Sequence, residues 1–541
     1  MRTDYDYIIV GAGAAGCVLA DKLSASGKRS VLLLEAGPLD KSPFIHMPRG
    51  VGALFGEPKY FWRYAIEPDP GNGDKVEFWL RGKTLGGSGA VNGMVYNRGR
   101  PEDYDQLETA GCVGWNWSTM LRHFRANEDH VLGASESRGA GGPVRISMPS
   151  RTNPFYEAVL DNGAAIGLER VEDVNDHRKA SVVGYCPWNV KNGRRWSSAM
   201  AFLRRERSRR NLKVLTGALV DKLSFQRQRT TGVKLADGRA FRANREVILA
   251  AGAIASPMIL QRSGVGPRDL LDRLGIPVVA EAPEVGQNIL DHRCISLQFR
   301  VTPQASFNQD FRLPKLLWNV LFYWLTGKGP MSGGSFDLQG YMTVLPQSSR
   351  PDAQLLMSGF SLSNAPTSRR TVESKPGFTC LAFPLRPISK GQLAIRSTDP
   401  ADTPVIRANY FAHPEERAIA VGIVRTIRAY MGLAALKRFV VEEINPGAAV
   451  RTDEQILEAW GQRGGSGLHA VGSCRMGSDA HSVVDPDLRV RGIEGVRVAD
   501  LSVLPVMPSG NTNGPVMALA GRAAEIILKS DNELSAPGDG L

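Results

Sequence analysis

The stretch that decides the fold is YIIVGAGAAG, residues 7–16. Residues 7–10 form a short apolar run, which predicts a buried strand, and a glycine-rich turn follows it. Residues 17–26 are typical of a helix, which Gly27 ends because glycine is favoured just past a helix C-terminus. A second apolar run, residues 30–34, completes a strand–helix–strand unit. This order predicts a parallel sheet that is buried on both faces.

The residues of this turn have separate roles in a dinucleotide site. We expect Gly11 to make the tight turn, Gly13 to let a pyrophosphate approach the backbone, and Gly16 to let the helix pack on the strand. We expect Ala14 and Ala15 to line the site, and the following helix carries a partial positive charge at its N-terminus, which faces the phosphates. The turn therefore predicts the pyrophosphate end of a dinucleotide site.

An acidic residue stands where such a site needs one. Glu35 ends the second strand, about 20 residues after the turn, where a carboxylate accepts hydrogen bonds from the adenosine ribose hydroxyls. We expect the neighbouring Ala36 to line the same site. Because strand, turn, helix, second strand and carboxylate are all in place, a glycine-rich turn without a ligand is disfavoured. The pattern by itself does not separate FAD from NAD.

The composition is that of an ordinary globular protein, with 43% hydrophobic and 22% charged residues in a chain of 541. At roughly 100–200 residues per domain, this length predicts about three structural units. The six cysteines form no C-x-x-C pair, so we expect reduced thiols, no metal site and a cytoplasmic protein. The net charge of +12 allows an anionic partner, but the densest basic run, residues 204–210, is typical of a solvated helix end. No nucleic-acid-binding motif occurs, and we expect no nucleic-acid partner.

Residues 311–325, FRLPKLLWNVLFYWL, come closest to a membrane span, but Pro314, Lys315 and Asn319 interrupt them. We interpret this segment as core packing or an active-site lid, with a position on a membrane surface as the alternative. A strand pattern begins almost at once, so we expect no signal peptide. These observations predict no transmembrane segment and leave open a peripheral contact with the inner face of a membrane.

Further blocks are spread along the chain. They are RGKTLGGSGAVN (81–92), GAIASPMILQRSGVG (252–266), VGQNILDH (285–292), HAVGSCRMG (469–477), VADLSVLP (498–505) and GNTNGP (510–515). Together with the first stretch, they resemble the signatures of the glucose–methanol–choline (GMC) oxidoreductase family, in family order, from residue 7 to about residue 530. One departure is Gly89, where the family usually has a second serine.

The resemblance implies an α/β fold with a Rossmann-like FAD-binding domain, built on a parallel sheet and assembled from discontinuous segments. It also implies an α+β substrate domain with an antiparallel sheet. We assign residues 1–150, 205–300 and 460–530 to the FAD-binding domain, and residues 151–204 and 301–459 to the substrate-binding domain. Residues 531–541 are expected to form a polar tail. Within the first segment, residues 40–150 look irregular, with many glycines, prolines and aromatics.

The same resemblance identifies FAD as the cofactor and implies further binding residues. Some family members bond the flavin covalently through a histidine at the position of Val91; valine cannot form that bond, so we expect non-covalent FAD. The segment 92–95 is expected along the isoalloxazine ring. The cofactor residues implied beyond the first stretch are Arg81, Gly86, Gly87, Ser88, Asn92, Gly93, Met94, Val95, Val220, Ala251, Gly252, Asp500, Leu501, Asn511 and Asn513.

Two residues carry the implied chemistry. Oxidising an alcohol with a flavin requires a base for the hydroxyl proton, and neutral imidazole has a suitable pKa. It also requires a hydrogen-bond donor aimed at the developing alkoxide. By resemblance, His469 is the base and the amide of Asn511 holds the substrate oxygen. His292 is the rival histidine, which we interpret as structural and near the cofactor.

The resemblance implies a FAD-dependent oxidoreductase that oxidises a primary alcohol to the aldehyde, as a dehydrogenase or an oxidase. The electron acceptor would be O2 or a quinone-type carrier. A choline-like substrate would need a carboxylate or an aromatic cage, for which Asp337 is a candidate; a neutral alcohol is at least as well supported. Two alternatives use the same fold, a hydroxynitrile lyase or a flavin photodecarboxylase, and a third is a non-catalytic flavoprotein.

Overall fold

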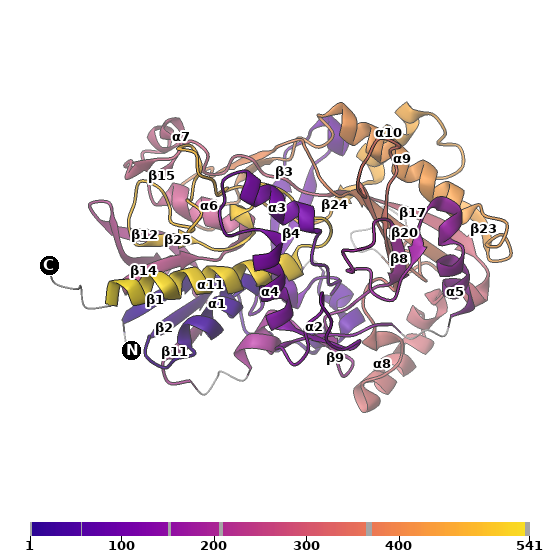
Figure 1. The fold of residues 1–541 in the computed structure, drawn as a ribbon, viewed down its shortest axis with the longest axis horizontal. Helices are drawn as coiled ribbons and strands as arrows, with labels where there is room; N and C mark the ends of the chain where they lie inside the picture. Colours follow the sequence, from indigo (N-terminus) through magenta and orange to yellow (C-terminus); the bar gives the residue numbers. More distant parts are fainter. Residues whose placement is uncertain (1–2, 56, 150–152, 205–208, 364–370, 536–541) are drawn as a thin grey trace.

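Two β-sheets dominate the molecule, one in each half of its long axis, and helices cover their outer faces (Figure 1). The computed structural model describes residues 3–55, 57–149, 153–204, 209–363 and 371–535. Residues 205–208, within the basic run noted above, lie outside this part of the chain.

The first sheet begins with the strand–helix–strand unit predicted from residues 7–34. Its parallel strands are β11 (Leu212–Thr216), β2 (Val31–Glu35), β1 (Asp4–Val10) and β14 (Ala240–Leu249), in that order. The sheet continues through antiparallel β13 (Arg229–Leu235) and β12 (Val220–Gln226), and β25 (Val496–Val498) pairs in parallel with β14. Every residue of β2 is buried, as expected for a parallel strand covered on both faces.

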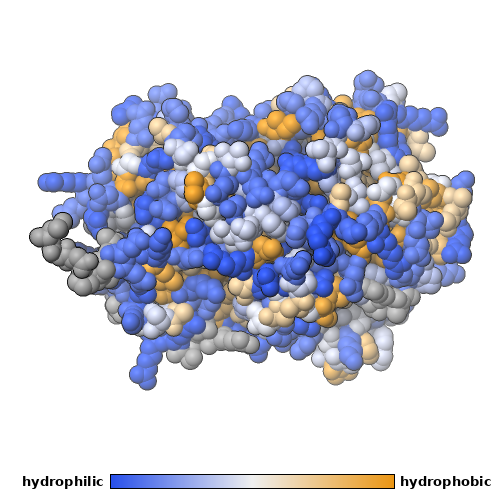
Figure 2. All heavy atoms as spheres, in the orientation of Figure 1, coloured by the Kyte–Doolittle hydropathy of each residue, from blue (hydrophilic) through white to orange (hydrophobic). Residues whose placement is uncertain are grey.

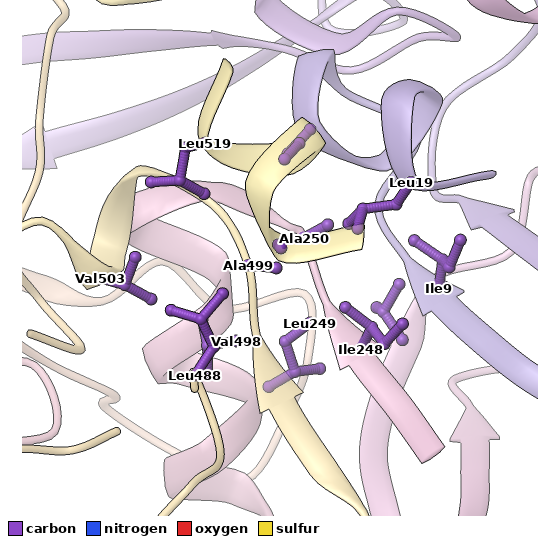
Figure 3. Packing of buried hydrophobic residues seen from close by; sticks show 14 of the residues in the cluster. Ile9, Leu19, Ile248, Leu249, Ala250, Leu488, Val498, Ala499, Val503 and Leu519 are labelled. Atoms are coloured by element: carbon purple, nitrogen blue, oxygen red, sulfur yellow. The ribbon is translucent and has the colours of Figure 1, made fainter. Parts of the chain in front are cut away.

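Two helices from opposite ends of the chain pack on this sheet. Helix α1 (Ala14–Ser24) begins directly after the glycine turn, three residues earlier than the sequence suggested. It packs against α11 (Asn513–Ser535), the last helix. Figure 3 shows the core between them, where Leu19 of α1 and Leu519 of α11 lie over Ile9, Ile248 and other buried strand residues. The two ends of the chain therefore share one hydrophobic core.

The second sheet lies in the other half, and in the part of the chain that the structure describes its strands pair antiparallel except for β7 and β8. Within the described residues, its order is β23 (Val440–Asn445), β17 (Arg293–Val301), β20 (Gly377–Pro384), β19 (Ala353–Ser358), β18 (Leu338–Met342), β8 (Val182–Tyr185) and β7 (Glu169–Arg170), with β24 (Gly465–Ser466) beside β17. The core on this sheet includes residues of α5 (Pro154–Asp161), α9 (Pro414–Met431) and α10 (Asp453–Arg463). The predicted α/β fold with a parallel and an antiparallel sheet is confirmed.

The structure differs from the sequence-based interpretation in three places. Residues 40–150 are not irregular, because they contain α3 (Pro101–Thr109), α4 (Trp117–Asn127) and the hairpin β3 (Phe61–Ile66)–β4 (Glu77–Gly82). The helices are short, with 9 and 11 residues, which hid their periodicity. Strand β17 falls mostly within segment 205–300 but belongs to the second sheet.

The third difference is the expected polar tail, 531–541. Its first residues continue α11 to Ser535. Asp531 is buried and forms ion pairs with Arg29 and Arg245, which lie on the first-sheet side of the molecule. Asp531 is therefore part of the folded helix, because two arginines far away in sequence neutralise a carboxylate that the sequence placed in a polar tail.

Shorter elements connect these layers. They are α2 (Pro43–His46), β5 (Glu128–His130), β6 (Val144–Ile146), β9 (Val190–Lys191), β10 (Arg194–Arg195), α6 (Gly252–Arg262), β15 (Val265–Gly266), α7 (Arg268–Arg273), β16 (Ala280–Glu281), α8 (Lys315–Thr326), β21 (Gln392–Ala394) and β22 (Val405–Arg407). No helix in the described ranges is long and apolar enough to cross a membrane.

Candidate active site

One cavity of about 490 Å³ opens at the carboxyl ends of β1, β2 and β14, where nucleotide sites of such sheets lie. It brings together His469 and most of the predicted cofactor residues. These are Gly11, Gly13, Ala14, Ala15, Glu35, Ala36, Arg81, Gly87, Ser88, Asn92, Gly93, Met94, Val95, Val220, Ala251, Gly252, Asp500, Leu501, Asn511 and Asn513. Of the predicted residues, only Gly16 and Gly86 do not line it.

The glycines pack two loops against each other at the cavity wall. A Cβ on Gly87 would lie 2.7 Å from the Cα of Gly13, so the Gly87 loop has no room for a side chain there, whereas a Cβ on Gly13 would lie 4.0 Å from the Cα of Gly87. Gly16 is excluded from the cavity because it faces the preceding turn, where a Cβ would lie 1.9 Å from the carbonyl oxygen of Gly11. This leaves bare backbone beside the N-terminus of α1, which fits the pyrophosphate of a dinucleotide.

Glu35 is buried at the end of β2, and its carboxylate contacts the glycine turn. One oxygen accepts a hydrogen bond from Ala12 N (3.1 Å) and the other from Gly37 N (2.8 Å). Burial raises the pKa of Glu35 to about 7. Each carboxylate oxygen can accept more than one hydrogen bond, so Glu35 retains capacity for ribose hydroxyls at the adenosine end of the cavity.

Asn92 is held from behind by a buried arginine that the sequence did not single out. Arg195 Nη1 donates to the Asn92 carbonyl oxygen (2.6 Å) and to Asn92 Oδ1 (2.9 Å). Burial lowers the pKa of Arg195 to about 9, so the group remains cationic at neutral pH. Asn92 Oδ1 also accepts from Met94 N (3.0 Å), which shapes the segment expected along the flavin ring.

Asp500 joins two turns of the first sheet. Its Oδ2 accepts from Gly252 N (2.8 Å) and Ser256 Oγ (2.6 Å) at the start of α6, and its Oδ1 accepts from Ser502 N (2.8 Å). Burial raises its pKa, and these hydrogen bonds oppose that effect. The carboxylate thereby orders two loops that line the cavity.

His469 and Asn511 meet at the other end of the cavity, although they lie on separate segments. Asn511 Nδ2 is 3.1 Å from His469 Nε2. Asn511 Oδ1 accepts from Gln354 Nε2 (3.3 Å), which orients the amide nitrogen toward the histidine. The pair expected from the motifs is therefore in contact.

His292 is not a separate structural histidine, because it contacts His469 directly. The two Nδ1 atoms are 2.9 Å apart, and His292 Nε2 lies 2.9 Å from the carbonyl oxygen of Leu385. A carbonyl only accepts, so His292 Nε2 carries hydrogen. Burial lowers the pKa of His292 to about 4, so its ring is neutral at pH 7 and its Nδ1 must accept.

This contact assigns the hydrogen on His469. Its Nδ1 donates to His292, which leaves the lone pair on Nε2. Nε2 is the atom beside Asn511. Burial, together with His292 and Arg81, lowers the pKa of His469. The ring is therefore a neutral acceptor at the cavity wall.

The carboxylate of Asp291 holds the backbone of His469 in place. Asp291 Oδ1 accepts from His469 N (2.7 Å), and Asp291 Oδ2 accepts from Tyr410 Oη (2.7 Å). Arg81 Nη1 donates to the Leu468 carbonyl oxygen (2.9 Å). Asp291 sits in the VGQNILDH block, but its role depends on a contact 178 residues away, which no local pattern signals.

The wall around His469 is apolar. Phe383 packs on it with ring centroids 5.7 Å apart. Phe383 belongs to a hydrophobic cluster that supplies further lining residues, namely Met94, Val95, Cys294, Phe336, Leu356 and Leu381. Among the described residues, the carboxylates that line this cavity are Glu35 and Asp500, and both contact the nucleotide sheet. The His469 end therefore offers a substrate no negative charge.

Asp337, considered above for a cationic substrate, does not line this cavity. Its carboxylate pairs with Arg49 (3.1 Å) and accepts from Tyr156 Oη (2.7 Å), beside a separate cavity of about 650 Å³. In the described part of the chain, no cluster of three or more His, Cys, Asp or Glu residues is placed to hold a metal ion.

Comparison with known proteins agrees with this geometry. The sequence models of the GMC oxidoreductase family match residues 5–294 and 387–520. The chain is 36% identical over 532 residues to the alcohol dehydrogenase [acceptor] of Pseudomonas putida, covering 97% of this chain and 96% of that protein. It is 37% identical over 543 residues to the mitochondrial choline dehydrogenase of Homo sapiens, covering 97% and 90%. The crystal structure of pyridoxine 4-oxidase from Mesorbium loti superposes with a TM-score of 0.86 at 28% identity, covering 96% and 98%.

A Rossmann-like sheet, a glycine turn on bare backbone and a neutral histidine at the far end of one cavity define a dinucleotide-dependent oxidoreductase. The chain belongs to the GMC oxidoreductase family. It is a FAD-dependent alcohol oxidoreductase, and the predicted cofactor and class are confirmed.

Proposed function

We propose that this protein oxidises a neutral, apolar primary alcohol to the aldehyde, with His469 as base and Asn511 as oxyanion donor. The observation that carries the proposal is the His469–Asn511 contact of 3.1 Å in a cavity end that is lined by apolar side chains. The lone pair of His469 Nε2 and the amide donor of Asn511 Nδ2 lie side by side there, and this pair suits a hydroxyl group that loses its proton.

The two residues have complementary tasks. His469 Nε2 accepts the hydroxyl proton, and Asn511 Nδ2 donates a hydrogen bond to the oxygen as it becomes an alkoxide. Bound FAD supplies the two-electron acceptor for the hydride that leaves the substrate carbon as the carbonyl forms. His292 keeps the Nδ1 hydrogen of His469 in place throughout. The apolar wall excludes water, which strengthens these interactions.

The residues that would hold FAD are those of the cavity. Gly11, Gly13 and the start of α1 would bind the pyrophosphate, and Glu35 the ribose. The segment 92–95 would lie along the isoalloxazine ring. Val91 offers no atom for a covalent bond, so we propose non-covalent binding. The assignment of residues 1–150, 205–300 and 460–530 to FAD binding, like a cytoplasmic location, stays a prediction.

Because no carboxylate among the described residues lines the His469 end of the cavity, we propose a neutral alcohol over choline. A quaternary ammonium needs a carboxylate or an aromatic cage, and the carboxylates that line the described cavity contact the nucleotide sheet instead. Choline and 3,3-dimethylbutan-1-ol have nearly the same shape and differ in charge. Under anaerobic conditions, we expect the neutral isostere to bleach the flavin with at least about tenfold higher kcat/KM, equivalent to ~1.4 kcal/mol.

The same assay tests the base. His469→Ala should bind FAD and be reduced by the neutral alcohol at least ~100-fold more slowly, the usual cost of losing a general base. Faster reduction by choline would overturn the substrate class, and near-normal reduction of the His469→Ala protein would overturn the base.

Bleaching in the dark also separates this proposal from its alternatives. A hydroxynitrile lyase performs no net oxidation of an alcohol, a photodecarboxylase needs light, and a non-catalytic flavoprotein does neither. Mixing the reduced protein with O2 or with a quinone then identifies the electron acceptor, which we propose to be one of these two.

A further inference from the structure

Helix α8 presents large apolar side chains to solvent. Six residues in and beside it are between 49 and 76% exposed: Leu313, Leu317, Trp318, Leu321, Trp324 and Leu325. We call these six residues the α8 ridge. The helix projects from the lower right of the molecule in Figure 1, and Figure 2 shows hydrophobic residues at the outer tip of this projection. Contiguous exposed apolar surface of this kind marks an interaction site.

The exposed side of α8 is more apolar than that of a typical surface helix, and its buried side mixes polar residues with Leu316 and Val320. At about 100° per residue, its exposed leucines and tryptophans fall within an arc of roughly 120°. The polar Asn319 faces inward instead, where its Nδ2 donates to the Asp310 carbonyl oxygen (2.8 Å). Tyr323 is buried against Met47 and Met331. The helix is therefore anchored by its more polar side, and the apolar side is left for a partner.

The charges around the ridge are basic. No acidic residue occurs between Phe311 and Phe336, whereas Arg312, Lys315 and Lys328 lie in that segment. Lys315 pairs with Asp310 (2.6 Å), while Arg312 and Lys328 are exposed. Burial raises the pKa of Tyr323, and the nearby exposed Arg194 opposes that shift. The apolar ridge is thus bordered by positive charge.

We infer that the α8 ridge docks on the surface of an anionic phospholipid bilayer. Leucines would enter the acyl boundary, the tryptophans would lie at the headgroup level, and the basic residues would contact lipid phosphates. A projecting convex ridge suits insertion into a deformable surface. The proposal is independent of the alcohol chemistry proposed above.

Docking would also bring the catalytic cavity near the bilayer. Helix α8 rests on Met47 and Met331. The chain segments that continue from these residues reach Val51, Phe55, Ser335 and Phe336, which line the cavity. An apolar alcohol or a quinone dissolved in the membrane would therefore be concentrated beside the site.

The FAD-loaded protein can be tested by co-sedimentation with vesicles of equal parts phosphatidylcholine and phosphatidylglycerol. We expect wild type to bind, and Leu317→Gln/Leu321→Gln/Leu325→Gln to lose at least about tenfold in affinity through lost apolar burial. The matched control is Val113→Gln/Val441→Gln, which changes two valines of similar exposure, 71 and 66%, and should bind like wild type. Flavin absorbance and oxidation of a water-soluble alcohol verify that each variant is folded.

Charge is tested separately with Arg312→Glu/Lys328→Glu and with vesicles of phosphatidylcholine alone. Both changes should weaken binding several-fold. The proposal is overturned if wild type binds neither vesicle, if the leucine variant binds as well as wild type, or if both vesicle types bind equally. It is also overturned if light scattering shows a dimer of this chain that the leucine substitutions dissociate, since a second copy would then cover the ridge.

Discussion

The reactivity of His469 depends on which ring nitrogen carries hydrogen, and a buried neighbour decides this. His292 accepts from His469 Nδ1 only while it is itself neutral, with its own hydrogen directed at Leu385. Burial lowers the pKa of His292 to about 4, which keeps its ring neutral at pH 7. A histidine interpreted as structural thus orients the proposed base.

The low pKa of His292 predicts a pH-dependent stability. In the unfolded chain this histidine takes up a proton below about pH 6.5, whereas in the folded protein it does so only near pH 4. Its neutral form is therefore lost from the unfolded state first as pH falls, and up to about 3 kcal/mol of unfolding free energy should disappear between these values. In His292→Phe, which cannot titrate at this position, the free energy of unfolding measured with urea should fall less steeply from pH 7 to pH 4. If the free energy of unfolding fell equally steeply with pH in the two proteins, His292 would not be buried in its neutral form.

At the scale of elements, Asp500, two residues after β25, accepts two hydrogen bonds from the start of α6 and a third from Ser502 N. Asp500→Asn keeps one acceptor oxygen and places an NH₂ against donors, so at least one buried donor loses its partner. We expect a loss of about 1–3 kcal/mol in unfolding free energy and weaker FAD binding. Urea unfolding of the apoprotein and FAD titration measure the two effects. Asn97→Asp is not a suitable control because that residue lies beside Asn511; Asp237→Asn, exposed on a turn, should change neither quantity.

The elements that the sequence predicted are those with strong local signals. The β1–α1–β2 unit follows from its glycine turn and apolar runs. Helices α3 and α4 were missed because each spans only about three turns. The sequence could not place β17 in the second sheet, because a strand's sheet is decided by its partners, here β20 and β23, and not by its own residues.

The residues of the candidate site also fall into two groups, those that the sequence marks and those that only the structure reveals. Residues within motifs, such as His469, Asn511 and Glu35, could be named from the sequence, and the structure gathers them in one cavity. Arg195 and Asp291 act through partners more than a hundred residues away, so nothing in their own surroundings marks them. Asp337 was a reasonable candidate until its pairing with Arg49 and Tyr156 became visible.

At the scale of the whole molecule, FAD would bridge segments from both ends of the chain and so stabilise the fold. With non-covalent binding, acid precipitation should release the flavin into the supernatant. Removing it under mild conditions should lower the Tm, and FAD added at about 100 times its Kd should restore roughly 2.7 kcal/mol. A pellet that stays yellow would reveal a covalent bond and contradict the expectation from Val91.

The pairing of β14 with β25, and of α1 with α11, has a consequence for biosynthesis. A ribosome makes the glycine turn first, but β25 and α11 only some 480 residues later. Throughout that interval, the nascent chain contains the first residues of the nucleotide site, while the segments that complete the site have not yet been synthesised. We therefore expect cofactor loading to follow the synthesis of β25 and α11, and the unfinished sheet to be prone to aggregation until then.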